Sequence, residues 1–385
     1  MANRVANRYP GTAAGRQALE LDRGNPPTIG VERMDKNSSE PRDAAAEHRV
    51  SGAHLVGSVP LSNSSEVFLT VSGAIGRHLH RISDGETGAR SRWNSWTAPS
   101  YERTPGLELV EPPPGSYTPW RQARIVIDPK DLVLAPLGFS DAAIDSYGVF
   151  SSLKKSGKIP EHLRFQVCLP SPIAAMTILI EQNSRAAVEP AHVTRLTQEI
   201  NEIVDAIPNQ ELAIQWDVCQ DVGVWEGYYP AYFPDAKRGV IDRLKARAES
   251  IPDEVEVGFH LCYGDFQHKH FLEPQDLRVA TEIANALAAA INRTINWIHM
   301  PVPIDRDDFE YFAPLGNLSV QAETEIYLGL IHYDDGIEGA LRRIQTAQKV
   351  IKNFGAATEC GFGRRAPETI VPLLDLHAAI TRRVI

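Results

Sequence analysis

The feature that most constrains the fold is a repeated order of short apolar runs and longer amphipathic stretches, which begins near residue 50. Eight apolar runs start near residues 54, 81, 163, 212, 254, 294, 326 and 356, and a helical pattern follows each of them. Apolar runs without alternation are typical of strands that are buried on both faces, as in parallel sheets. Eight such units in about 330 residues predict an α/β fold, specifically a (β/α)8 TIM barrel.

The rival architecture is a doubly wound open sheet, but no G-x-G-x-x-G follows the first run, which disfavours a dinucleotide site. Residues 1–49 are polar and show no sustained period, so we predict a flexible N-terminal arm. Residues 50–385 are predicted to form the catalytic barrel domain. A Pro-rich insertion at about 89–162 is expected after its second strand.

Composition excludes several classes of protein. The net charge of −10 and the pI of about 5.7 argue against a partner made mainly of nucleic-acid backbone. No apolar run reaches the roughly 18 residues that a membrane span needs. Four cysteines are too few for a disulfide scaffold, and the N-terminal residues lack the apolar core of a secretory signal. We therefore expect a cytoplasmic protein with reduced thiols.

Polar side chains stand at the carboxyl ends of most predicted strands. In a barrel these ends converge on one mouth, where the chemistry of such folds is found. A single polar residue there would most simply be a hydrogen-bonded structural group, but their recurrence across the strands predicts a functional site. The residues are His54, Ser58, Asp84, Glu86, Gln215, Trp216, Asp217, His260, Cys262, Tyr263, His299, His332, Glu359 and Cys360.

His260 and Cys262 form the sharpest pattern among these strand ends, together with Cys360 on a later strand. Residues i and i+2 of an extended segment point to the same side, and imidazole with thiolate suits Zn²⁺. Three protein ligands with an open fourth position are the catalytic arrangement of zinc. The alternative is a pair of buried, unreactive cysteines. Cys168 and Cys219 are not part of such a pattern and are interpreted as structural.

Seven short motifs occur in the order in which a known superfamily carries them. Over about residues 52–383 the chain resembles the C-terminal catalytic barrel of the cobalamin-independent methionine synthases, a superfamily that includes epoxyalkane:coenzyme M transferase and, more remotely, uroporphyrinogen decarboxylase. The motifs are Val56-Gly57-Ser58-Val59-Pro60, Asp84-Gly85-Glu86, Leu169-Pro170-Ser171-Pro172, Gln215-Trp216-Asp217, His260-Leu261-Cys262-Tyr263-Gly264, Leu328-Gly329-Leu330-Ile331 and Cys360-Gly361.

The resemblance implies zinc held by His260, Cys262 and Cys360. The family's fourth ligand is a Glu on the next strand, where this chain has His299, so His299 is either a fourth ligand or a residue that acts on substrate. The family's Glu-Pro after the substrate-binding aspartate is replaced by Val-Cys after Asp217.

The expected activity is a zinc-dependent alkyl or methyl transfer to a thiol, because coordination to zinc deprotonates thiols. His332 or His299 is the expected general acid, and His332, Asp334 and Glu359 are the predicted catalytic residues. The predicted substrate-binding residues are Asp84, Glu86, Asp217, Gln215, Ser58, His54, Trp216 and Tyr263.

Two other functions stay open from the sequence. A zinc-dependent lyase or hydrolase, acting by decarboxylation, retro-aldol cleavage or C–X cleavage, would use the same barrel without a thiol cosubstrate. A degenerate barrel that only binds a ligand is the third reading. The expected partners are a small-molecule substrate and a thiol cosubstrate, with neither nucleic acid nor membrane. The oligomeric state is open between a monomer and a homodimer.

Overall fold

The structure is a computed structural model that describes residues 48–116, 119–266 and 269–385. Almost all of the predicted N-terminal arm, residues 1–49, lies outside the described residues. The following account concerns the described part of the chain.

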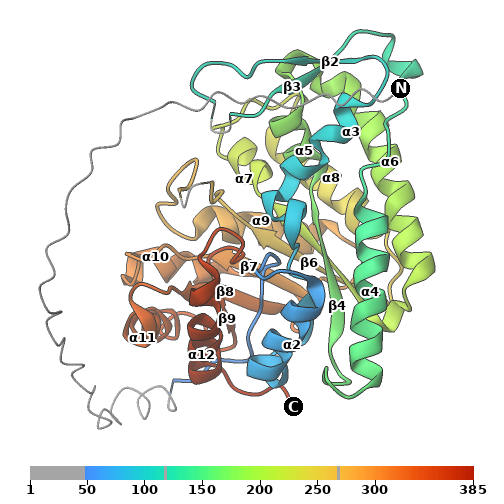
Figure 1. Cartoon of the computed structure of the whole chain (residues 1–385). Helices are drawn as coiled ribbons and strands as arrows, with labels where there is room; N and C mark the ends of the chain where they lie inside the picture. The colour runs from blue at the N-terminus through green and yellow to red at the C-terminus, as the bar shows by residue number, and fades with distance from the viewer. Residues whose placement is uncertain (1–47, 117–118, 267–268) are drawn as a thin grey trace, which may run out of the picture. The chain divides into compact units, whose positions relative to one another are not determined.

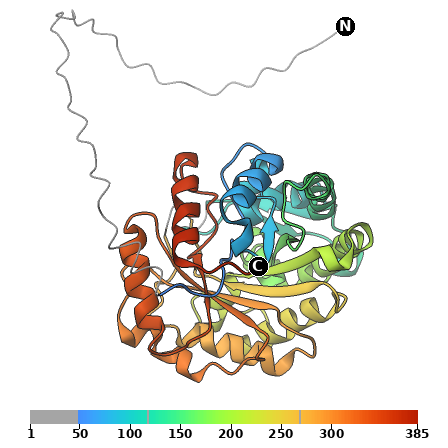
Figure 2. The same cartoon turned by 90° about the horizontal axis from the view of Figure 1, so that it is seen from below.

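A seven-stranded, all-parallel sheet forms the centre of the fold, with the strand order β1-β4-β5-β6-β7-β8-β9. Each strand pairs with the next central strand along the chain, and the end view in Figure 2 shows the sheet curling inside a layer of helices. Seven of the eight predicted strands are thereby confirmed. They are β1 (Arg81–Ser83), β4 (Arg164–Pro170), β5 (Leu212–Val218), β6 (Glu256–Leu261), β7 (Trp297–Pro301), β8 (Glu325–Ile331) and β9 (Gly355–Thr358).

The first predicted strand is reduced to isolated bridges. Ala53 forms a parallel bridge with Leu79, just before β1, and another with Ala356 in β9. The backbone N–H of Ala53 donates to His78 O at 2.7 Å, and that of His54 donates to Ala356 O at 3.0 Å. Residue 53 thus contacts both edges of the sheet, although no regular strand forms there. The fold is a TIM-like α/β fold with a curled parallel sheet.

Helices cover the outer face of the sheet, as Figure 1 shows. Several begin where the sequence supplies a cap: the Asn63 side chain accepts from Glu66 N before α2, and the Ser171 side chain accepts from Ala174 N before α5. No helix in the described part of the chain is long and apolar enough to cross a membrane. The helices are α2 (Ser64–Ile75), α3 (Ala98–Glu102), α4 (Phe139–Lys155), α5 (Pro172–Leu179), α6 (Arg185–Ala206), α7 (Gln220–Trp225), α8 (Ala236–Glu249), α9 (Arg278–Ala290), α10 (Phe309–Phe312), α11 (Gly336–Ala347) and α12 (Ile370–Ile380).

The predicted insertion at about 89–162 contains two different parts. Its first part holds a 3-10 segment (Gly88–Thr97), helix α3 and an antiparallel hairpin of β2 (Leu107–Val110) and β3 (Gln122–Ile125). Its second part holds α4, which packs against β4 and α6 as the crossover helix between β1 and β4. The irregular excursion that the sequence indicated is therefore confined to the segment before α4.

The interior of the curled sheet is separate from the main core between sheet and helices. Ala213, Trp297 and Tyr327 form a buried cluster of their own. At the amino end of the strands, the Arg81 guanidinium lies 4.1 Å from the Trp297 ring centre and pairs with Glu256 and, at 2.8 Å, with Glu325. Because aromatic rings and ion pairs fill this end, a ligand site inside the sheet must lie toward the carboxyl ends of the strands.

Candidate metal centre

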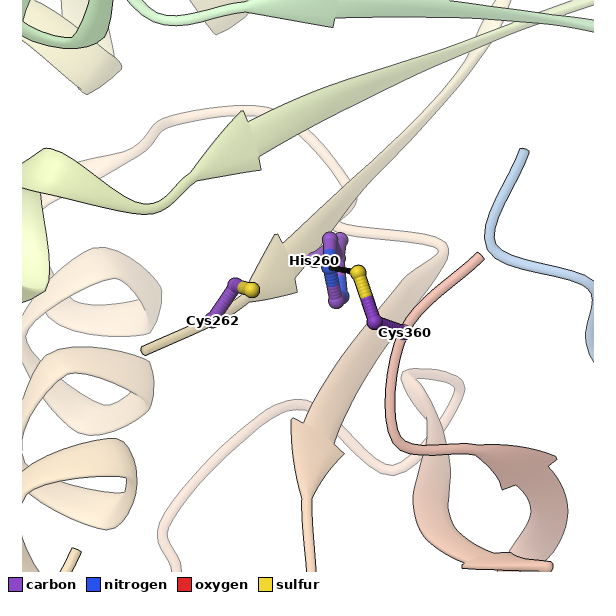
Figure 3. A group of neighbouring side chains, drawn as sticks. All are labelled: His260, Cys262 and Cys360. Atoms are coloured by element: carbon purple, nitrogen blue, oxygen red, sulfur yellow. Dashed lines mark hydrogen bonds between the residues drawn. The ribbon is translucent and has the colours of Figure 1, made fainter. Parts of the chain in front are cut away.

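His260, Cys262 and Cys360 come together at the carboxyl edge of the sheet. His260 lies in β6, Cys262 follows that strand directly, and Cys360 follows β9. Their ligand atoms all lie within 4.8 Å of one another, and Figure 3 shows the Cys360 sulfur beside the His260 ring. One imidazole and two sulfurs are donors that suit Zn²⁺, so this group could bind a metal ion.

The protonation of the three donors follows from their burial. Burial and the neighbouring His299 lower the pKa of His260 well below its usual value, so its ring is neutral at pH 7. A hydrogen bond with the Cys219 thiol raises the pKa of Cys262, and a hydrogen bond with Cys262, together with burial, raises that of Cys360. Both thiols are therefore protonated when no metal ion is bound, and binding of a metal ion would release their protons.

His299 lies behind His260 and is not brought into the group of three. Its Nδ1 is 2.7 Å from Nδ1 of His260, and its Nε2 is 3.0 Å from Thr358 O. Burial lowers the pKa of His299 to about 3, so this ring is also neutral. Both of its ring nitrogens are engaged away from the two cysteines.

A cavity of about 690 Å³, counting its space open to solvent, lies in front of the three donors. Six of the predicted site residues line it: Ser58, Glu86, Asp217, His260, Cys262 and Cys360. Aromatic and aliphatic side chains form much of the remaining wall, among them Val56, Trp93, Trp120, Ile178 and Phe266. This composition is typical of sites for small molecules, which are mostly apolar with a few placed polar groups.

Two carboxyl groups face this cavity in a buried setting. Asp217 accepts a hydrogen bond from Trp93 Nε1 at 2.8 Å and another from Gln215 Nε2 at 2.9 Å. Burial raises the pKa of Asp217, and burial followed by the charge of Asp217 raises that of Glu86. Glu86 and Trp93 also have positive φ angles, of 47° and 51°, which non-glycine residues rarely adopt. Such backbone strain is often concentrated at functional sites.

Arg364 places a positive charge beside His260, Cys262 and Cys360, the candidate metal-ligand group. Its Nη2 lies 3.5 Å from Cys360 Sγ, and the same guanidinium pairs with Asp265 at 2.6 Å. A cation next to a sulfur favours the thiolate, which is the form that binds metal ions. Arg364 is not among the residues predicted from the sequence, because nothing in the local pattern distinguishes it from an ordinary loop arginine.

Cys219, interpreted from the sequence as structural, also lines the cavity. Val218 pairs with Leu261 in the β5–β6 ladder, so Cys219 and Cys262 are the next pair, and the N–H of Cys262 donates to Val218 O at 3.1 Å. Cys219 could have been identified from the sequence by its i+2 spacing from Asp217, because this spacing points both side chains to one side of the strand.

Three predicted substrate-binding residues support the cavity without lining it. Gln215 is buried, its Oε1 accepts from His54 Nε2 at 2.9 Å, and its Nε2 donates to Asp217 at 2.9 Å. Asp84 pairs with Arg90 at 2.5 Å and accepts from the backbone N–H of Glu86 at 2.9 Å. These contacts place Gln215, His54 and Asp84 beneath or beside the residues that face the cavity.

The other predicted residues point elsewhere. Trp216 is buried in the main core, as the strand alternation from Gln215 and Asp217 requires. Tyr263 donates its hydroxyl to Glu226 at 2.6 Å. His332 has its Nε2 2.8 Å from Val302 O, Asp334 is exposed, and Glu359 lies 3.3 Å from His270 Nε2. None of these five is among the described residues that line the cavity.

Comparisons with known proteins identify the fold. No protein-family model matches the chain. No curated protein matches it by sequence either. Among solved structures, a B12-independent methionine synthase from a Shewanella species, in complex with selenomethionine, is similar with a TM-score of 0.56 and 15% identity, over 86% of this chain and 96% of that chain. A putative vitamin-B12 independent methionine synthase from Listeria monocytogenes has a TM-score of 0.52 and 15% identity, over 86% of this chain and 98% of that one.

These likenesses extend over nearly the whole of both solved chains and most of this one. At 15% identity they bear on the fold alone. In this chain, six of the seven motifs that suggested the resemblance lie at or just after the carboxyl end of a strand, and the motif at residues 56–60 lies outside the strands. The chain therefore has the fold of the cobalamin-independent methionine synthases.

Proposed function

We propose that this protein is a zinc-dependent enzyme that transfers a methyl or larger alkyl group to a substrate thiol. The observation that carries the proposal is the group of His260, Cys262 and Cys360, whose donor atoms lie within 4.8 Å of one another at the wall of a cavity. Support comes from the shared fold with methionine synthases, one of which was solved with selenomethionine bound.

Under this proposal His260, Cys262 and Cys360 hold the metal ion. When bound, zinc would lower the pKa of a thiol substrate and keep the thiolate in place. Arg364, beside Cys360, offsets part of the negative charge that the thiolates bring. The largely apolar cavity walls position the alkyl donor.

The transfer itself needs one proton acceptor and one proton donor. The thiol S–H gives up its proton to the carboxyl pair of Glu86 and Asp217, the sulfur attacks the alkyl carbon, and the bond from that carbon to its leaving atom breaks as the S–C bond forms. Glu86 and Asp217 have raised pKa values, so this carboxyl pair can hold a proton near neutral pH. We propose that this carboxyl pair then donates the proton to the leaving atom, because His332 and His299 do not line the cavity.

We also propose that the curled sheet is a closed barrel. The bridges of Ala53 to Leu79 and to Ala356 join its two edges through the segment before α2. Closure would hold β9, and with it Cys360, at a fixed distance from β6, which carries His260. A shared, rigid frame is what a metal site assembled from distant strands requires.

The test combines metal analysis with an assay for transfer. We expect about one zinc per chain in the purified protein, lost in Cys262→Ser and in Cys360→Ser. Cys219→Ser is the matched control, since Cys219 lines the same cavity but lies outside the group of three, and it should keep the metal. Retention of zinc by either ligand variant would contradict the assignment.

The transfer assay uses a panel of alkyl donors with and without small-molecule thiols, with mass spectrometry of the S-alkyl product. A product that forms only when the thiol is present supports transfer. Cleavage of a donor at the same rate without any thiol would instead indicate the lyase or hydrolase alternative.

A further inference from the structure

The two histidine rings behind the cavity form one hydrogen-bonded pair. His260 of β6 and His299 of β7 are register partners, and their ring centres lie 4.8 Å apart. The Nδ1 atoms are 2.7 Å apart, and both side chains are buried. The remaining nitrogens point in different directions: His299 Nε2 lies 3.0 Å from Thr358 O, and His260 Nε2 lies 3.9 Å from Cys360 Sγ.

The positions of the protons follow from counting donors and acceptors. A backbone carbonyl only accepts, so the hydrogen bond to Thr358 requires a proton on His299 Nε2. A neutral His299 ring then has no proton on Nδ1, which must accept. His260 therefore donates from Nδ1, and the lone pair of its Nε2 faces Cys360 Sγ at 3.9 Å. Protonation of either ring to a cation would be costly, because the cation would be buried beside neutral partners, an imidazole and a backbone carbonyl.

The series of hydrogen bonds through His260 and His299 also reaches Cys360. Thr358 is the last residue of β9, and its Oγ1 donates to Cys360 O at 2.7 Å. The residue that accepts the proton of His299 thus also fixes the backbone of a sulfur donor. His260, His299, Thr358 and Cys360 form a continuous link between the two strands that supply the metal-ligand group.

We propose that His299 is a positioning residue that fixes the tautomer of His260, so that a metal ion binds at His260 Nε2. This inference rests on the proposed function only where it concerns the metal, since the tautomer is a property of the metal-free protein. A second residue of this kind typically contributes about 10- to 100-fold to metal affinity. The proposal gives His299 a role other than that of a ligand or an acid.

Two variants separate positioning from mere packing. His299→Leu removes both hydrogen bonds, whereas His299→Gln keeps a carbonyl oxygen to accept from His260 Nδ1 and an amide to donate to Thr358 O. His192→Gln is the matched control, because His192 is a buried histidine that bonds to Tyr101 Oη at 2.8 Å away from the cavity. All measurements use the full chain.

The first measurement is ¹⁵N NMR of the metal-free protein with labelled histidine, with the His260 signals assigned by their loss in His260→Gln. We expect the proton on Nδ1 in the wild type and in His299→Gln. The second is Zn²⁺ affinity by competition with a chelator. We expect it to fall about 10- to 100-fold in His299→Leu, and to stay near the wild-type value in His299→Gln and His192→Gln.

Three results would overturn the proposal. The first is a proton on Nε2 of His260 in the wild type, and the second is an unchanged Zn²⁺ affinity in His299→Leu. The third is an equal loss of Zn²⁺ affinity in both His299 variants, together with a Co²⁺ absorption spectrum that shows one ligand fewer, because His299 would then be a ligand. If His299→Leu does not fold, the NMR measurement of the His260 tautomer in the wild type and in His299→Gln still tests the proposal. If the wild type binds no zinc, the proposed function fails, whereas the NMR result still tests the role of His299.

Discussion

Asp221 makes a strong prediction about stability, because it is a buried carboxyl group with an incomplete set of partners. It lies in α7, directly after the cavity residue Gln220, and its side chain is fully buried. Ser171 Oγ donates to its Oδ2 at 2.5 Å, and Oδ1 has no hydrogen-bond partner among the described residues. Burial raises the pKa of Asp221 from 3.8 to about 7.

The sign of the pH effect follows from this shift. Between pH 3.8 and 7 the unfolded chain has lost the proton while the folded chain keeps it, so the free energy of unfolding falls as the pH rises. One proton corresponds to about 1.4 kcal/mol per pH unit, so the shift costs roughly 4 kcal/mol above pH 7. Below pH 3.8 both states are protonated and the cost disappears.

Asp221→Asn removes the titration while leaving an oxygen to accept from Ser171. We expect the stability of the variant relative to the wild type to improve by about 3 kcal/mol between pH 5 and pH 8, as measured by urea unfolding at both values. Any constant loss from the new amide cancels in this difference. Asp242→Asn, which removes an exposed carboxylate that pairs with Arg238, is the control. Parallel stability curves for Asp221→Asn and the wild type would refute the reasoning.

Two further predictions concern the sheet interior and the metal-ligand group. A Cβ atom at Gly258 would lie 2.0 Å from the buried Trp297 ring, so Gly258→Ala should lower the free energy of unfolding by about 1–3 kcal/mol or prevent folding; a variant with wild-type stability in urea would contradict the packing. Arg364→Gln removes the cation that lowers the pKa of the Cys360 thiol, so zinc binding should require a higher pH than in the wild type. Chelator competition from pH 6 to 9 measures the shift, and identical pH profiles would argue against it.

Much of the fold could be predicted because the strands are uniformly apolar and the helices amphipathic. Seven predicted strands form, whereas the segment near residue 53 pairs with the sheet only through isolated bridges and forms no regular strand. The bounds of the insertion stay a prediction; helix α4 lies inside the predicted range, because the Pro-rich stretch before it obscured its amphipathic pattern.

The metal-ligand group could be predicted from the convergence of strand ends, whereas the residues around it could not. Strand alternation would have removed Trp216 from the candidates, because its neighbours on either side point inward. Arg364 and Trp120 reach the cavity from loops, and no periodicity in the sequence reports the path of a loop. His299 was predicted at the end of its strand, but β7 continues to Pro301. Which of the His299 nitrogens faces which partner depends on ring orientation, and the sequence does not contain that.

The choice between Glu359 and Cys360 shows how closely the site depends on strand register. In the β8–β9 ladder Leu328 pairs with Ala356, but Ile331 pairs with Thr358, so the register shifts by one residue. Partners in a ladder share a face, and a one-residue shift exchanges the faces of successive side chains. Gly329 permits the shift, since a Cβ there would lie 2.7 Å from the Glu359 Cα. The sequence offered both residues as candidates because it contains the strand ends but not the register. Backbone packing at one glycine thus helps to place a sulfur, rather than a carboxylate, beside His260.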